Sequence, residues 1–161
     1  MGEETETATI VVFSGELDRA LAAFNIATTA ASMGMEVTLF FTFWGLNVVT
    51  REKTGSADRK TLQKMMGMMN KGGARRLKLS RMNMFGGGKA AMKMLMKEYH
   101  MPSLEEMIPM AKELGVRFLA CTTSMALMGL EESDFIPEVD DFVGAATYVE
   151  NASRSKINLF I

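Results

Sequence analysis

The chain has 161 residues, of which 48% are hydrophobic and 23% are charged, and its formal net charge is −1. This composition is typical of a soluble globular protein, and a chain of this length buries roughly two thirds of its unfolded surface on folding. The near-neutral charge supplies no electrostatic footprint for nucleic acid, so nucleic acid is not expected as a partner. We predict one domain over residues 1–161, with residues 1–8 as a flexible N-terminus.

Cys121 is the only cysteine, so the chain cannot form an internal disulfide. The first residues, Met1–Thr7, are acidic, whereas a secretory signal would be basic and then apolar. Charged residues interrupt every apolar stretch before it reaches the roughly 18 residues that favour a membrane span. We therefore expect a cytoplasmic protein without a membrane span.

The N-terminal part of the chain is predicted to form a strand, a helix and a second strand. Thr9–Ser14 is rich in β-branched residues, which favours a strand, and Gly15 marks the turn that follows it. Glu16–Met33 carries apolar residues at helical spacing and Gly34 ends it, after which Glu36–Phe43 again has the composition of a strand. A spacing of about 25 residues between strands suits a right-handed βαβ crossover, so the two strands should be parallel.

The middle of the chain is rich in methionine, since 12 of the 17 methionines fall between Met65 and Met110. Thioethers can bind Cu(I), but no cluster of cysteine or histidine accompanies them. Methionine also packs adaptably against partners, so we interpret the segment as a subunit interface and expect a homo-oligomer. The preceding polar stretch, Arg51–Arg59, is predicted to be a surface loop or a frayed helix.

Gly86–Lys89 superficially resembles a phosphate-binding loop. The Walker pattern requires glycine five positions before Gly88 and serine or threonine after Lys89, but Asn83 and Ala90 stand there. The dinucleotide pattern G-x-G-x-x-G is also missing after the first strand. We interpret Gly86–Lys89 as a turn and expect no cofactor.

The C-terminal part of the chain continues the alternation of helices and strands. Pro102 and Ser103 start a helix that runs to about Leu114, and the apolar segment Val116–Ala120 is a strand with Cys121 at its carboxyl end. The remaining expected elements are a short helix Met125–Leu130, a helix Asp141–Ser153 and a last strand Ile157–Ile161. This order predicts an α/β fold, a single-domain doubly wound, mainly parallel sheet with helices on both faces.

Three loops should converge at the carboxyl ends of the strands, where open α/β sheets bind ligands. They are Ser14-Gly15, Phe43-Trp44-Gly45 and Cys121-Thr122-Thr123-Ser124. Helix N-termini, hydroxyls, an aromatic wall and a thiol make a small pocket suited to a compact anion or a persulfide. A cysteine beside a helix N-terminus is predisposed to ionise, which makes Cys121 the candidate nucleophile.

Each of these residues also has a purely structural interpretation. Free cysteine is often a buried, inert side chain, and Trp44 can be an ordinary packing or interface residue. Ser14 and Gly15 can serve only as cap and turn, and the hydroxyls of residues 122–124 only as helix caps. His100, the sole histidine, is expected in a surface turn without a role in the chemistry.

Four segments together resemble the DsrE/DsrF-like family of sulfur-relay proteins, and the resemblance covers almost the whole chain. Their order and spacing are more specific than any one of them. The segments are Ile10–Phe24, Met33–Leu46, Lys112–Gly129 and Ala145–Tyr148.

The resemblance implies a doubly wound α/β fold, assembly into trimers or hexamers, and a cysteine on this loop that carries sulfane sulfur as a persulfide. Cys121 matches that cysteine. It further implies a small TusA-like sulfur carrier as partner, a persulfide or thiosulfonate as sulfur donor, and a setting in dissimilatory sulfur metabolism or tRNA thiolation. Ser124 stands where a resolving cysteine would sit, so transfer would have to be intermolecular.

Other interpretations remain open at this point. The chain is either a sulfurtransferase or a stoichiometric sulfur carrier, and the rival is a ligand-binding or assembly subunit on the same fold with an inert thiol. A thiol peroxidase is a weaker rival, because its T-x-x-C arrangement would need threonine where Phe118 stands.

Overall fold

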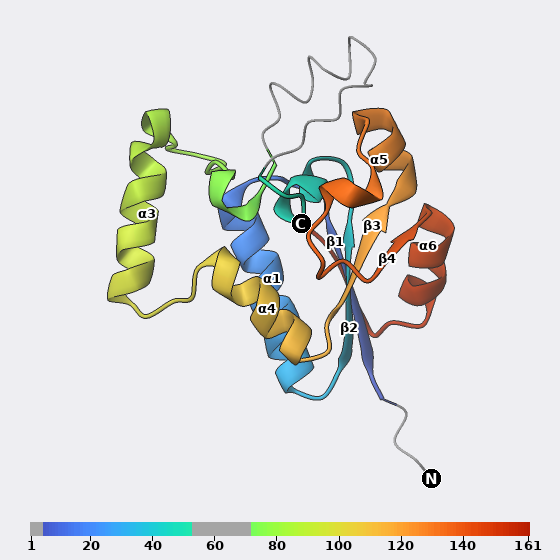
Figure 1. Ribbon diagram of the computed structural model, residues 1–161. Helices are drawn as coiled ribbons and strands as arrows, with labels where there is room; N and C mark the ends of the chain where they lie inside the picture. Colours follow the sequence, from blue (N-terminus) through green and yellow to red (C-terminus); the bar gives the residue numbers. More distant parts are fainter. Residues whose placement is uncertain (1–4, 53–71) are drawn as a thin grey trace.

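The computed structural model describes residues 5–52 and 72–161. Its strands form one parallel sheet in the order β4-β3-β2-β1-β5, with helices on both faces (Figure 1). This confirms the predicted α/β fold and the parallel pairing of the first two strands. The strands are β1 (Thr7–Val12), β2 (Glu36–Phe41), β3 (Arg117–Cys121), β4 (Asp141–Val143) and β5 (Ile157–Phe160).

Two helices, α1 (Leu17–Ser32) and α4 (Leu104–Glu113), cover one face of the sheet (Figure 1). Alternate strand residues such as Leu39 and Phe118 point to this face, where the ring of Phe118 lies edge-on to Phe24 of α1 at 5.6 Å. The start of α4 is fixed by Ser103, whose hydroxyl and backbone form a reciprocal capping box with Glu106. The main hydrophobic core therefore lies between the sheet and these helices.

The opposite face of the sheet carries α6 (Ala145–Ser153), which has no fully buried residue. A second, smaller apolar cluster lies here, and Phe40 stacks on Tyr148 of α6 at a centroid distance of 5.0 Å. Phe160 of β5 remains 70% exposed beside Phe13. The thin cover leaves apolar surface next to this cluster, whose buried members are Val11, Phe40, Leu119 and Cys121.

The helix α3 (Gly87–Glu98) stands away from the rest of the fold (Figure 1). Its only fully buried residue among those described is Met96, while Met94 is exposed, as are Met84 and Phe85 in the preceding η3 (Met84–Gly86). The expected interface role of the methionine-rich segment stays a prediction. The methionines from Met65 to Met69, and residues 53–59 of the expected polar loop, lie outside the described residues.

The predicted turn at Gly86–Lys89 is corrected, because α3 already begins at Gly87. Gly86 has φ +100°, which is a left-handed conformation that glycine adopts without strain, and the helix starts directly after it. The sequence did not predict a helix here because glycine is a poor helix former, and α3 begins with two glycines. His100 lies exposed in the turn after α3, as expected.

The predicted helix Asp141–Ser153 is wrong at its beginning. Asp141–Val143 is the edge strand β4, which pairs with β3 so that Cys121 lies opposite Val143, and α6 starts only after Gly144. Three residues are too few to show a strand pattern in the sequence. They form a strand because the edge of β3 offers backbone hydrogen-bond partners. Strand β1 likewise begins at Thr7, inside the expected flexible N-terminus.

The remaining short elements close the carboxyl edge of the sheet. They are η1 (Phe43–Val48), η2 (Ala74–Arg76), α5 (Thr122–Met128) and η4 (Glu132–Asp134). The helix α5 starts directly after Cys121, three residues before the expected start at Met125. Across residues 5–52 and 72–161, no helix has the length and apolar character needed to cross a lipid bilayer.

Candidate functional site

The three loops expected to converge lie side by side at the carboxyl edge of the sheet. The N–H of Gly45 in η1 donates to the carbonyl of Phe13 at 2.7 Å. A Cβ atom at Gly45 would lie 1.8 Å from the carbonyl oxygen of Val12, so this approach of η1 to β1 requires glycine. On the other side, the hydroxyls of Thr42 and Ser124 lie 2.8 Å apart and tie the end of β2 to α5.

Cys121 is the last residue of β3 and the N-cap of α5. Burial raises the pKa of its thiol, but hydrogen bonds from the N–H and hydroxyl of Ser124, the hydroxyl of Thr42 and the N–H of Thr123 outweigh that effect. The pKa of the thiol therefore lies below its ordinary value. A lowered pKa increases the thiolate fraction at a given pH, and the role of Cys121 as a nucleophile stays a prediction.

The two hydroxyl groups cannot both donate to the sulfur while they bond to each other. Each hydroxyl has one proton, and the 2.8 Å bond between Thr42 and Ser124 uses one of the two. The other proton is then available for Sγ, whichever residue supplies it. At most one of the two hydroxyls can therefore donate to Sγ while the bond between Thr42 and Ser124 persists.

Cys121 is more buried than expected for a nucleophile in an open pocket, since only 5% of its surface is exposed. Its cluster is closed on the outside by the partly buried side chains of Phe13, Val143 and Tyr148. With 5% of its surface exposed, Cys121 offers a partner protein little direct access in this conformation. The surroundings are polar on the α5 side and apolar on the α6 side.

The structure does not bring the predicted residues together in a single pocket. Ser14, Gly15 and Trp44 line an open cleft of about 1200 Å³, and Cys121 is not among its lining residues. The hydroxyl of Ser14 accepts the N–H of Glu16 at 3.2 Å, which is the local turn role considered for it. Phe13 lines the cleft and also contacts the cysteine cluster, so it separates the two environments.

The other predicted residues take different positions around Cys121. Phe43 is 43% exposed and its ring lies 5.6 Å from that of Phe13. Thr122 and Thr123 are exposed on α5, and Thr123 reaches the sulfur through its backbone N–H. Ser124 is buried and reaches it through both N–H and hydroxyl.

Sequence reasoning missed Thr42, which lies one residue before the predicted loop Phe43-Trp44-Gly45. The same rule that selected the loop, proximity to the carboxyl end of a strand, would have included this residue. The basic residues Arg75, Arg76 and Lys78 were also missed as lining residues of the cleft, because no motif in the sequence marks them as part of a binding site. In the described part of the chain, no group of three or more His, Cys, Asp or Glu residues is arranged to hold a metal ion.

Two full-length relatives are similar to this chain. The protein YrkE of Bacillus subtilis is 42% identical over 161 residues, with 100% of both chains covered. A protein of Allochromatium vinosum named sulfur carrier protein DsrE2 is 32% identical over 161 residues, covering 98% of this chain and 99% of its own.

Two solved structures share the fold at low sequence identity. The ychN protein from E. coli has a TM-score of 0.56 at 8% identity, covering 98% of this chain and 100% of its own. MTH1491 from Methanobacterium thermoautotrophicum has a TM-score of 0.53 at 15% identity, covering 97% and 99%. The family model described as DsrE/DsrF/DrsH-like matches residues 4–160. Because this model covers nearly the whole chain, the chain belongs to the DsrE/DsrF/DrsH-like family.

Proposed function

We propose that this protein is a sulfur-relay protein that accepts sulfane sulfur on Cys121 as a persulfide and passes it to a small TusA-like carrier. The observation that carries the proposal is the set of N–H and O–H donors around Sγ, which lowers the pKa of the thiol despite its burial. Membership of the family and the 32% identity to a protein named a sulfur carrier support it.

The chemistry consists of two nucleophilic displacements at sulfur. The Cys121 thiolate attacks the outer sulfur of a persulfide R–S–SH, a new S–S bond forms, and the old S–S bond breaks with its electron pair leaving on R–S⁻. With a thiosulfonate donor, the leaving group is the sulfinate. The thiolate of an acceptor then attacks the outer sulfur on Cys121, takes it as its own persulfide and returns Cys121 to the thiolate.

The acceptor must lie on another molecule, because Cys121 is the only cysteine of the chain. The N–H and O–H groups that hold the thiolate are also placed to stabilise it as the leaving group in the second step. The same site thus serves acceptance and release of sulfur, which is what a carrier requires.

We further propose a homo-oligomer, a trimer or a hexamer. Phe43 and Phe160 are 43% and 70% exposed, and both rings contact Phe13 at 5.6 and 5.5 Å. An aromatic cluster of this kind on the thinly covered sheet face leaves apolar surface that a second copy would bury. Because Phe13 also contacts the cysteine cluster, such an interface would lie beside Cys121.

A specific observation also favours the rival function, a ligand-binding or assembly subunit with an inert thiol. Cys121 is 5% exposed and packs in a cluster with Val11, Phe40 and Leu119, as a structural cysteine does. Iodoacetamide labelling separates the two proposals. A carrier thiol is alkylated in the folded protein with a pH midpoint below that of a cysteine in an unfolded peptide, whereas an inert thiol is not alkylated or shows no such shift.

The direct test is mass spectrometry of the protein after exposure to a low-molecular-weight persulfide or thiosulfonate. We expect an adduct heavier by one sulfur atom in the native chain and none in Cys121→Ala. Adding a TusA-like protein should then remove the adduct from Cys121 and produce it on the acceptor. Absence of an adduct with every donor, in a protein shown to be folded, would refute the proposal.

A further inference from the structure

The open cleft beside the Cys121 site has five basic residues among the thirteen described residues that line it. It lies between the start of α1, η1 and the segment 74–79, and Lys89 of α3 reaches it from outside. One carboxylate, Glu16, faces five basic side chains among the lining residues that the structure describes. The basic residues are Arg19, Arg75, Arg76, Lys78 and Lys89.

This concentration of positive charge does not follow from the composition, because the chain as a whole has a formal net charge of −1. Arg19 is paired with Glu16 at 3.0 Å, and Arg75 approaches Glu105 at 3.7 Å. Within residues 5–52 and 72–161, the other three basic side chains have no carboxylate within 4.0 Å. A cleft lined by one sign of charge concentrates the field and attracts anions.

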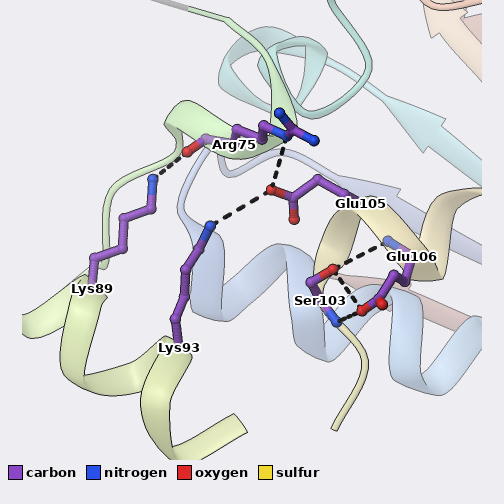
Figure 2. Close-up of polar contacts among 6 residues, drawn as sticks. All are labelled: Arg75, Lys89, Lys93, Ser103, Glu105 and Glu106. Atoms are coloured by element: carbon purple, nitrogen blue, oxygen red, sulfur yellow. Dashed lines mark hydrogen bonds and ion pairs between the residues drawn. The ribbon is translucent and has the colours of Figure 1, made fainter. Parts of the chain in front are cut away.

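Two of the cations, Arg75 and Lys89, take part in the contacts that attach α3, shown in Figure 2. The ammonium group of Lys89 donates to the backbone carbonyl of Arg75, and Lys93 lies 3.6 Å from Glu105 of α4. Burial and the nearby charge of Lys93 lower the pKa of Lys89, and Glu105 partly opposes this. Lys89 is thus a partly desolvated cation, for which an anion in the cleft would be a favourable neighbour.

The cleft also has an aromatic wall. Trp44 is 44% exposed, and both Trp44 and Phe13 line the cleft together with the hydroxyl of Ser14. A Cβ atom at Gly15 would lie 2.6 Å from the carbonyl oxygen of Trp44, so the glycine lets η1 lie directly against the start of the α1 segment. A flat ring beside several cations matches a ligand that has both a ring and phosphate groups.

We propose that this cleft binds a small organic polyanion, a phosphate ester that carries a flat ring, with Arg76, Lys78 and Lys89 on the phosphates and Trp44 on the ring. The volume of about 1200 Å³ is sufficient for a whole molecule of that class, because ligand pockets commonly measure about 300–1,000 Å³. Cys121 does not line the cleft, so this proposal stands independently of the proposed sulfur transfer.

Trp44 is the only tryptophan of the chain, so intrinsic fluorescence reports on the cleft wall directly. The full-length protein is titrated with ADP and, separately, with inorganic pyrophosphate, both without divalent metal, and isothermal titration calorimetry gives a second readout. We expect saturable binding of both probes, with ADP the tighter because its ring also contacts Trp44. Cys121→Ala should bind ADP as the native chain does.

The variant Arg76→Ala/Lys78→Ala removes two cations that have no carboxylate partner among the described residues and keeps the backbone bond from Leu17 to the Lys78 carbonyl. It also removes the hydrogen bond that Arg76 donates to the carbonyl of Glu52 at 2.8 Å. We expect its dissociation constant for ADP to rise at least about tenfold, since each removed charge weakens a charge-assisted contact. The matched control is Lys97→Ala/Arg117→Ala, which removes two exposed charges outside the cleft and should leave affinity unchanged. Circular dichroism verifies that each variant is folded.

Three outcomes would overturn the proposal. The first is no saturable signal with either probe up to about 5 mM, a concentration that exceeds even weak specific affinities. The second is an equal loss of affinity in the control variant, which would mean that general surface charge attracts the anion. The third is pyrophosphate binding as tightly as ADP, which would remove the ring from the proposed ligand.

Discussion

The hydrogen-bond network of Thr42, Ser124 and Cys121 leads to a quantitative prediction. Either Ser124→Ala or Thr42→Val alone should leave the pKa of the Cys121 thiol nearly unchanged, whereas the two together should raise it. The hydroxyls bond to each other at 2.8 Å, so one proton of the pair is available for Sγ. When one hydroxyl is removed, the other loses its neighbour and can donate its own proton to the sulfur.

The double variant leaves the thiolate without any hydroxyl donor. A hydrogen bond to a charged group contributes about 1.5–3 kcal/mol, so below the pKa the thiolate fraction should fall roughly tenfold to a hundredfold. The less stabilised thiolate is intrinsically more nucleophilic, which offsets about half of the loss on a logarithmic scale. The alkylation rate near neutral pH should therefore fall about three- to tenfold in the double variant and stay close to native in each single variant.

The assay is the rate of iodoacetamide alkylation as a function of pH, and the sole cysteine means that no other thiol contributes. Because Cys121 is buried, the carbon NMR shift of its Cβ provides a titration that does not depend on access by a reagent. Thr→Val and Ser→Ala are close in volume, so packing is largely retained. The reasoning would be refuted if the two single substitutions each raised the pKa of the Cys121 thiol and their effects added. It would also be refuted if the thiol of the double variant titrated like that of the native protein.

Three further predictions concern the fold and its assembly. Gly45→Ala should lower the free energy of unfolding in urea by about 1–3 kcal/mol, because the added Cβ atom would overlap a carbonyl oxygen of β1. The control Gly144→Ala should leave it unchanged, because a Cβ atom there meets nothing within 4 Å. Burial raises the pKa of Asp18, but hydrogen bonds from Ser80 outweigh that effect, so the pKa of this carboxyl is lowered. The free energy of unfolding of the native protein should therefore exceed that of Asp18→Asn fully above the ordinary carboxyl pKa, and the difference should disappear as the pH falls through the lowered pKa. A difference that grows on acidification would contradict this. Phe160→Glu should shift the protein to a smaller species in analytical ultracentrifugation, and an unchanged mass would exclude this residue from the interface.

Local patterns predicted most of the elements of the fold correctly. The β-branched run near residue 10 and the apolar run before Cys121 are strands, and Ser103 with Glu106 forms the expected helix start. These elements were accessible because their stabilising partners lie within a few residues or on a regular period. The fold class followed from the alternation of strands and helices, which restricts the possible topologies.

The composition of the site depended on contacts between residues far apart in the chain. Thr42 and Ser124 are 82 positions apart, and their hydroxyls meet only because β2 and β3 are neighbours in the sheet. The same holds for the cleft, where Lys89 of α3 joins residues at the start of α1. The burial of Cys121 also depended on α6 and the β1 loop, which close over its cluster.

The strand β4 is a backbone element that the sequence pattern could not predict. Its three residues carry no period, and their identity as a strand arises from the free edge of β3 that they complete. The amino-acid order was thus sufficient for α1, α4, the inner strands and the one thiol at a strand end, because these express local preferences. Which donors surround that thiol, how deeply it is buried, and where cations gather were settled by packing, because each of them is a relation between segments that only folding brings into contact.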